Sequence, residues 1–288
     1  MFRALLALSF VLTLQACSDA GPVTAQGDPC QDGEDALAEG NSEAAITSFE
    51  ACLESVELEP AREAIIHTRL GGAYLYEERF EDALHEFNLA YAIAETQGVE
   101  FDNPYVRRNR GIARRYTGNT DGAIEDLEAA RRELPQDVMT QLNLGGLYGE
   151  LGRNAEAVAA FDTVTRLEPE WAGGWINLSA ALLDLDLNDQ AIDNARRAVE
   201  IDPESGFALN ALCWALVMNS QYDTALPICD QAVDAEPENG AIVHSRAAAL
   251  EGLDRIDEAR ELYARAYELN PDSETLERDY LRTRINAE

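Results

Sequence analysis

A repeat with a period of 34 residues runs along most of the chain and constrains the fold more than any other feature. Each unit contains a small residue, an Ala twelve positions later, a second residue four positions further on and a small residue three positions after that. The pattern begins at Gly111, Gly145, Ser179, Cys213 and Ala247. Spacings of three and four residues are typical of helices, and no unit shows the alternation of a strand. Each unit is therefore predicted to be a hairpin of two helices.

Proline residues close the units at the same interval. They are Pro135, Pro169, Pro203, Pro237 and Pro271. A Pro at this point stops the second helix and sets the turn into the next unit. Two further units with looser spacing begin their patterns at Gly33 and Gly71. The sequence predicts seven hairpins, near 26–59, 64–97, 104–137, 138–171, 172–205, 206–239 and 240–271, followed by a capping helix over 272–288.

The period, the Ala-rich second helix and the terminal Pro together resemble the tetratricopeptide repeat family. The first-helix signature of that family is matched by Leu144-Gly145-x-x-Tyr148 and by Trp175-x-x-Leu178-Ser179, the latter with Ser in place of Gly. The resemblance implies an all-α fold, a right-handed superhelical α-solenoid whose first helices line a concave groove. It also implies a protein or peptide as partner, and no enzymatic activity.

The N-terminus is typical of a bacterial export signal. A short basic start at Met1–Arg3 precedes an apolar stretch over 4–16, which is too short to span a bilayer. The stretch ends in Leu14-Gln15-Ala16-Cys17, which resembles the lipobox of bacterial lipoproteins. This resemblance implies a signal peptide over 1–16, a lipidated Cys17 with a flexible tether over 17–29, and a solenoid over 30–288. The alternative is an ordinary signal peptide with a chance Cys.

The same resemblance implies where the protein resides. Ser18 follows the lipidated Cys, and family members with Asp at that position are the ones held in the inner membrane. We therefore expect a protein of the bacterial cell envelope, lipid-anchored in the outer membrane on its periplasmic face.

Four cysteines remain besides Cys17, and an even number in an exported chain suggests pairs. Cys213 and Cys229 occupy facing positions of one hairpin, so a disulfide between them would staple the sixth unit. Cys30 and Cys52 fall in the two helices of the first unit and form the second predicted pair. Free packed thiols are the alternative.

The charge and the motifs exclude several functions. The formal net charge is −32, and all 22 basic residues are Arg, so binding to nucleic acid or to anionic lipid headgroups is disfavoured. The membrane would be contacted only through the lipid anchor. No Ser-hydrolase, zinc-protease or phosphate-loop motif occurs, and the three His residues are scattered over different units. The sequence predicts no catalytic residue, metal or cofactor.

Asparagines recur on the expected groove face. Asn109, Asn143 and Asn177 lie two positions before the small residue in three consecutive units, and Asn210 is close to the next equivalent position. Such a ladder of amides can bond the backbone of an extended peptide without reading its sequence. It is similar to the asparagine ladder of O-GlcNAc transferase. The alternative is that these side chains only cap or solvate an exposed face.

Apolar side chains form the rest of the expected groove lining. The candidates are Ile176, Phe207, Trp214 and Met218. Trp214 is the first candidate for an anchor, because Trp dominates binding hot spots. Its alternative role is packing onto the neighbouring unit.

The third unit carries an unusual arginine cluster over 107–115, in which Arg108 and Arg115 are the candidate binding residues. The cluster either pairs with carboxylates of the chain itself or captures an acidic segment or C-terminal carboxylate of a partner. Together these features predict a membrane-anchored scaffold or adaptor, of the kind that serves envelope, pilus or secretion assembly. The alternative is a structural component whose repeats mediate homo-oligomerisation.

Overall fold

The structure, a computed structural model, describes residues 27–99, 101 and 103–285. All regular elements of the described residues are α-helices. They are α2 (Pro29–Ala38), α3 (Ser42–Ser55), α4 (Pro60–Tyr76), α5 (Phe80–Gln97), α6 (Pro104–Tyr116), α7 (Thr120–Glu133), α8 (Val138–Glu150), α9 (Asn154–Leu167), α10 (Ala172–Leu183), α11 (Asn188–Ile201), α12 (Gly206–Met218), α13 (Tyr222–Ala235), α14 (Gly240–Gly252), α15 (Ile256–Leu269) and α16 (Glu274–Ile285).

These helices form seven hairpins, from α2–α3 to α14–α15, and a final single helix α16. The all-α solenoid of about seven hairpins is therefore confirmed. The predicted signal peptide and Cys17 lie outside the described residues. None of the helices that the structure describes is long and apolar enough to cross a membrane.

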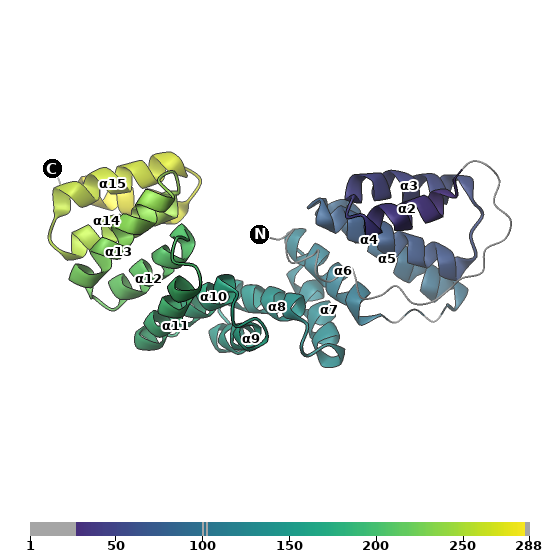
Figure 1. Cartoon of the computed structure of the whole chain (residues 1–288), viewed down its shortest axis with the longest axis horizontal. Helices are drawn as coiled ribbons and strands as arrows, with labels where there is room; N and C mark the ends of the chain where they lie inside the picture. Colours follow the sequence, from purple (N-terminus) through teal and green to yellow (C-terminus); the bar gives the residue numbers. More distant parts are fainter. Residues whose placement is uncertain (1–26, 100, 102, 286–288) are drawn as a thin grey trace. The chain divides into compact units, whose positions relative to one another are not determined.

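The chain divides into two compact units, with the boundary between Leu147 and Tyr148 inside α8. The first unit contains α2 to α7, and the second contains α9 to α16. Within the second unit, Figure 1 shows the hairpins following one another in sequence order from α10–α11 to α14–α15. The first helices of successive hairpins also touch one another there, α10 beside α12 and α12 beside α14.

The small residue of the repeat allows the two helices of a hairpin to approach closely. A Cβ on Gly71 would lie 2.9 Å from the Phe87 ring, and a Cβ on Gly111 would lie 2.8 Å from Leu127 Cγ. Phe87 and Leu127 are fully buried between the helices. In the last hairpin Ala247 and Tyr263 take the same two positions and belong to one core cluster. The repeated small–bulky pair thus forms the centre of each of these hairpins.

Every hairpin turn contains one residue in the left-handed conformation. These residues are Gly40, Glu78, Gly118, Gly152, Asp186, Ser220 and Asp254. The positive φ lets the chain leave the first helix and enter the second within a few residues. Four of the seven are not glycine, so those turns carry a steric cost that Gly would avoid.

Neighbouring hairpins in the second unit are also joined through helix ends. Asn154, the first residue of α9, donates from Nδ2 to the carbonyl oxygen of Asp184 at the end of α10, at 2.8 Å. Asn188 at the start of α11 donates in the same way to the carbonyl oxygen of Met218, at 3.2 Å. Carbonyl groups at the end of a helix have no partner inside the helix. The second helix of one hairpin therefore supplies a partner to the first helix of the next.

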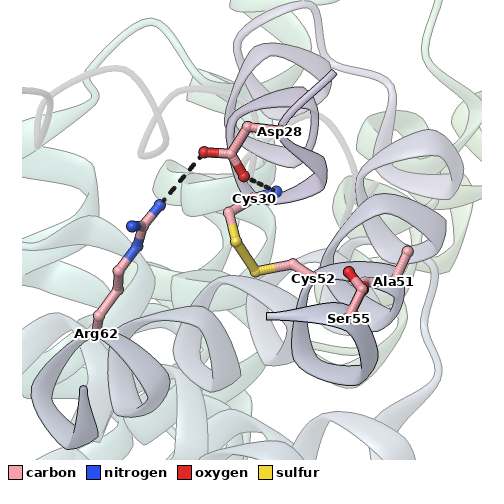
Figure 2. The surroundings of a disulfide bond; sticks show 6 residues. All are labelled: Asp28, Cys30, Ala51, Cys52, Ser55 and Arg62. Carbon is pink, nitrogen blue, oxygen red and sulfur yellow. Dashed lines mark hydrogen bonds and ion pairs between the residues drawn. A yellow bond between two sulfur atoms is a disulfide. The ribbon is translucent and has the colours of Figure 1, made fainter. Parts of the chain in front are cut away.

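Two disulfides cross-link helices within hairpins. Cys30 on α2 is bonded to Cys52 on α3, with a Cα–Cα distance of 4.9 Å. Figure 2 shows this bond beside Asp28, whose carboxylate accepts from the Cys30 amide at 3.0 Å and pairs with Arg62 at 3.7 Å. Cys213 and Cys229 are joined across α12 and α13, at a Cα–Cα distance of 5.1 Å. These are the two pairs that the cysteine positions predict.

The final helix α16 packs on both helices of the last hairpin. Leu276 enters a core cluster with Ile242 and Ala266. Its polar contacts include the pair of Arg282 with Glu251, with Nη2 2.8 Å from Oε2, and His244 Nε2, which lies 2.9 Å from Asp279 Oδ2. The helix covers an end that would otherwise expose the core, which is the role expected of a cap.

Candidate functional site

An apolar stripe runs along the exposed side of α12. Phe207 is 53% exposed and Met218 is 42% exposed, while Ala211 and Trp214 between them are half-buried. Their spacing of four, three and four residues places them on one side of the helix. The remaining apolar side chains of α12 are buried, because its other sides contact α10, α11, α13 and α14.

A second, weaker stripe lies on α10, which packs beside α12. Ile176, Asn177 and Leu183 are half-buried there, and Ala180 is exposed. Neither α10 nor α12 contains an Asp, Glu or Arg residue, although 26% of the chain is charged. The two helices therefore present an uncharged face to solvent, and we call the exposed and half-buried residues of α10 and α12 the α10/α12 face.

Trp214 is only partly available to a partner. Its ring lies 5.8 Å from the ring of His244 on α14, and His244 in turn contacts the edge of Tyr263 at 5.2 Å. The indole therefore contacts the neighbouring hairpin but stays half-buried, so part of the side chain is exposed to solvent. Both roles considered for Trp214, anchor and inter-hairpin contact, are compatible with this position.

The asparagines of the predicted ladder differ in their surroundings. Asn143 is 2% exposed; its Nδ2 donates to the Met139 carbonyl at 2.9 Å, and its Oδ1 accepts from Arg115 at 3.2 Å. The Arg115 guanidinium covers it because Gly146 leaves room: a Cβ there would be 2.5 Å from Nη2. Asn143 is thus buried, where an open groove position was expected.

The other asparagines are half-buried. Asn109 Oδ1 accepts from Arg108 Nε at 3.0 Å. Asn177 belongs to the α10/α12 face, and so does Asn210, whose Oδ1 is enclosed without a hydrogen-bond partner among the described residues. Their role as peptide ligands stays a prediction.

The arginine cluster of α6 is engaged with the chain's own carboxylates. Arg110 and Arg114 share Asp126, at 2.6 Å and 2.8 Å, and Asp126 is almost fully buried. Arg108, itself buried, pairs with Asp137 at 2.9 Å, and Arg107 pairs with Glu133 at 2.5 Å. Of the two interpretations of the cluster, intramolecular pairing accounts for these contacts.

A cleft with a volume of about 240 Å³ lies in the first unit between α4 and α6. Its lining includes two predicted site residues, Arg108 and Asn109, and the exposed side chains Ile65 and Tyr105. Sequence reasoning missed Ile65, Tyr105 and Arg69, which also lines the cleft. Phe101 and Asn103, from the connection that follows α5, form part of its wall.

No arrangement in the described residues points to catalysis. The described part of the chain contains no group of three or more His, Cys, Asp or Glu residues that could hold a metal ion. The clearest perturbed carboxyls are structural. Hydrogen bonds from Arg282 lower the pKa of Glu251, and burial would raise the pKa of Asp279 but the hydrogen bonds from His244 and Arg278 bring it below its usual range. Both hold α16.

Sequence profiles described as "Tetratricopeptide repeat" match residues 31–98, 108–157, 142–206 and 216–278. No curated protein matches the sequence.

Solved structures match the fold. A tetratricopeptide repeat protein from Parabacteroides merdae is 14% identical, with a TM-score of 0.66 over 88% of this chain and 97% of that one. The C-terminal part of a TPR repeat-containing protein from Cytophaga hutchinsonii is 12% identical, with a TM-score of 0.60 over 85% and 97%. A thermophilic TPR protein of Thermus thermophilus is 23% identical, with a TM-score of 0.55 over 64% and 100%. At these identities the similarity concerns the fold alone.

Proposed function

This chain belongs to the tetratricopeptide repeat family, and from that premise we propose that it is a protein-interaction scaffold of the bacterial cell envelope, anchored to the outer membrane through a lipid on Cys17. Proteins of this family generally mediate protein–protein interactions and are generally not enzymes. The partner is a peptide segment or a domain bound on the first helices.

The observation that carries this proposal is the α10/α12 face. Large apolar side chains that are left exposed together, as Phe207 and Met218 are, usually mark a binding surface. Trp214 lies between them with one side open, and amphipathic aromatic residues of this kind dominate interface energetics. The cleft between α4 and α6 is a second surface on first helices, lined by Ile65 and Tyr105.

In-cell photocrosslinking tests the scaffold function. A photoreactive residue replaces Met218 on the α10/α12 face or Ile65 at the cleft, and Glu261, exposed on the second helix α15, serves as the matched control. We expect a discrete crosslinked band with another protein from position 218 or 65 and none from 261. Products from neither of the two surfaces would reject the function.

The anchor is tested separately. Cys17→Ser should move the protein from the membrane fraction to the soluble fraction and abolish labelling by a fatty-acid analogue. Unchanged membrane association would reject the anchor. Self-association, the alternative role, predicts a molecular mass by light scattering that rises with concentration. A protein that remains monomeric at all concentrations would exclude it.

A further inference from the structure

The charges around the α10/α12 face are almost all negative. From Glu168 to Ser245 the only basic side chains besides His244 are Arg196 and Arg197. Both are on α11, and both are paired: Arg197 with Glu170 at 2.9 Å and with Glu200 at 3.3 Å, and Arg196 with Asp193 at 3.6 Å. Beyond this stretch, Arg246 of α14 pairs with Asp230 at 2.6 Å, and Arg265 of α15 donates to the Pro237 carbonyl oxygen at 2.7 Å; α10 and α12 themselves contain no Arg.

Acidic residues repeat along one edge of this face. They precede the first helices of successive hairpins in the pattern acid–Pro–acid, as Glu168 and Glu170, Asp202 and Glu204, and Glu236 and Glu238. All are exposed except Glu236, which is half-buried because it packs against Gly206 at the start of α12. Acidic side chains near the start of a helix also interact favourably with the positive end of the helix dipole. That effect explains why they stand there; Glu170 is also paired with Arg197, at 2.9 Å.

The opposite edge, at the ends of α10 and α12, is acidic as well. Asp184 and Asp186 follow α10, and Asp223 lies in the first turn of α13, the helix that comes after α12; all three are exposed. The α10/α12 face is thus an apolar strip between two negatively charged rims. A partner that covers it must match both the apolar centre and the negative edges.

We infer that the α10/α12 face binds a cationic amphipathic segment of a partner protein, with apolar side chains on Phe207, Trp214 and Met218 and Arg or Lys side chains at the acidic rims. This inference rests on the proposed scaffold function and names the chemistry of its partner. A second copy of this chain fits less well, because its net charge of −32 would bring like charges together. An anionic membrane surface is repelled for the same reason.

The test uses the full chain in cells, with the photoreactive residue at position 218, and identifies the crosslinked segment by mass spectrometry. Glu204→Arg and Glu238→Arg together reverse the sign of the charge at two positions of the acidic rim; this double substitution is the rim variant. Glu261→Arg and Glu268→Arg, two exposed residues of the second helix α15, change the total charge by the same amount without altering a rim residue. We expect a segment with net positive charge around the crosslinked residue. The rim variant should lower the crosslinking yield about tenfold, and the α15 variant should leave it unchanged.

Each other outcome overturns the inference. If the crosslinked segment is neutral or acidic and the rim variant does not change its crosslinking yield, the charge complementarity is refuted while the scaffold function stays intact. Crosslinks to a second copy of the chain would assign the face to self-assembly. Products from position 65 without any from position 218 would move partner binding to the cleft of the first unit, and products from neither would reject both proposals.

Discussion

The side chain of Asn154 donates a hydrogen bond to the Asp184 carbonyl oxygen, which lies in the following hairpin, at 2.8 Å. The bond satisfies a helix-end carbonyl that α10 cannot satisfy itself. Asn154→Ala should therefore lower the free energy of unfolding by about 1 kcal/mol, measured by urea denaturation. Asn194→Ala is the control, because the Asn194 amide bonds only within its own helix, to Gln190, on the surface. Equal effects of the two variants would show that the inter-hairpin bond is not stabilising.

Gly149, near the end of α8, and Gly152, in the turn that follows, should respond in opposite directions to the same substitution. Gly152 has a φ of +69°, so Gly152→Ala places a Cβ in a left-handed residue and should destabilise the fold by about 1 kcal/mol. Gly149 is helical, with no atom within 4 Å of a Cβ, so Gly149→Ala should stabilise by about 0.5–1 kcal/mol. Thermal unfolding measures both. Destabilisation by Gly149→Ala would contradict the helical geometry described for α8.

Asn143 and Asn177 should have different roles although they occupy equivalent positions in the repeat. Asn143→Ala removes a buried hydrogen bond to the Met139 carbonyl and a half-buried one from Arg115, so it should cost about 1–3 kcal/mol of stability. Asn177→Ala should leave stability within about 0.5 kcal/mol, because the side chain is half-exposed. If Asn177 contacts a partner, its variant lowers the crosslinking yield from position 218. Equal stability losses for both variants would remove this distinction.

The packing of α16 should weaken in acid. The pKa values of Glu251 and Asp279 are lower in the folded chain than in the unfolded chain. Their contribution is therefore complete above the unfolded values, near 4, and is lost as the pH falls through the folded pKa values. The protection factors of α16 amides against hydrogen exchange should fall below about pH 4 before those of α12.

Glu251→Gln provides the control for this pH effect. The variant removes one of the two titrating carboxyls together with its charge-assisted bond to Arg282. Protection of α16 should be lower at neutral pH and should change less on acidification. An unchanged pH profile in this variant would show that Glu251 does not mediate the acid sensitivity.

The two disulfides should stabilise the protein by about 3 kcal/mol each in the chain-entropy model, because they close loops of 22 and 16 residues. Cys30 and Cys52 lie in the first hairpin, and their replacement by Ala should increase exchange of α2 and α3 while sparing α12. Replacement of Cys213 and Cys229 should have the reverse effect. Uniform loss of protection in either double variant would contradict the nearest-neighbour behaviour expected of repeats.

The helices and their pairing could be predicted because each hairpin depends on local spacing. Gly71 and Phe87 are sixteen residues apart in the sequence, and the same spacing and close approach occur between Gly33 and Phe49 and between Gly111 and Leu127, so the periodicity predicts the contact directly. The cysteine pairs fall within single hairpins in the same way, and the structure joins them as predicted.

What could not be predicted depends on contacts between hairpins or on irregular connections. Arg115 covers Asn143 because Gly146 leaves space beside it, and the next unit has Gly149 at the position of Arg115. The cleft between α4 and α6 arises where the connection around 98–103 departs from the repeat. Asn154 and Asn188 do recur at the repeat interval, so their bonds to the next hairpin could have been found.

Those inter-hairpin bonds also bear on how a protein of this type can change length during evolution. Helix α9 supplies a helix-end partner to α10, and α11 supplies one to α12, so a duplication or deletion of one whole period in this region reproduces the same junction. The insertion or deletion can begin at any position of the repeat, provided that the segment gained or lost has the length of one full period. A shorter change would leave Asn154 or Asn188 facing the wrong turn of helix. The unit that can be gained or lost is thus any segment of one full repeat period, and it need not begin and end at the boundaries of a hairpin.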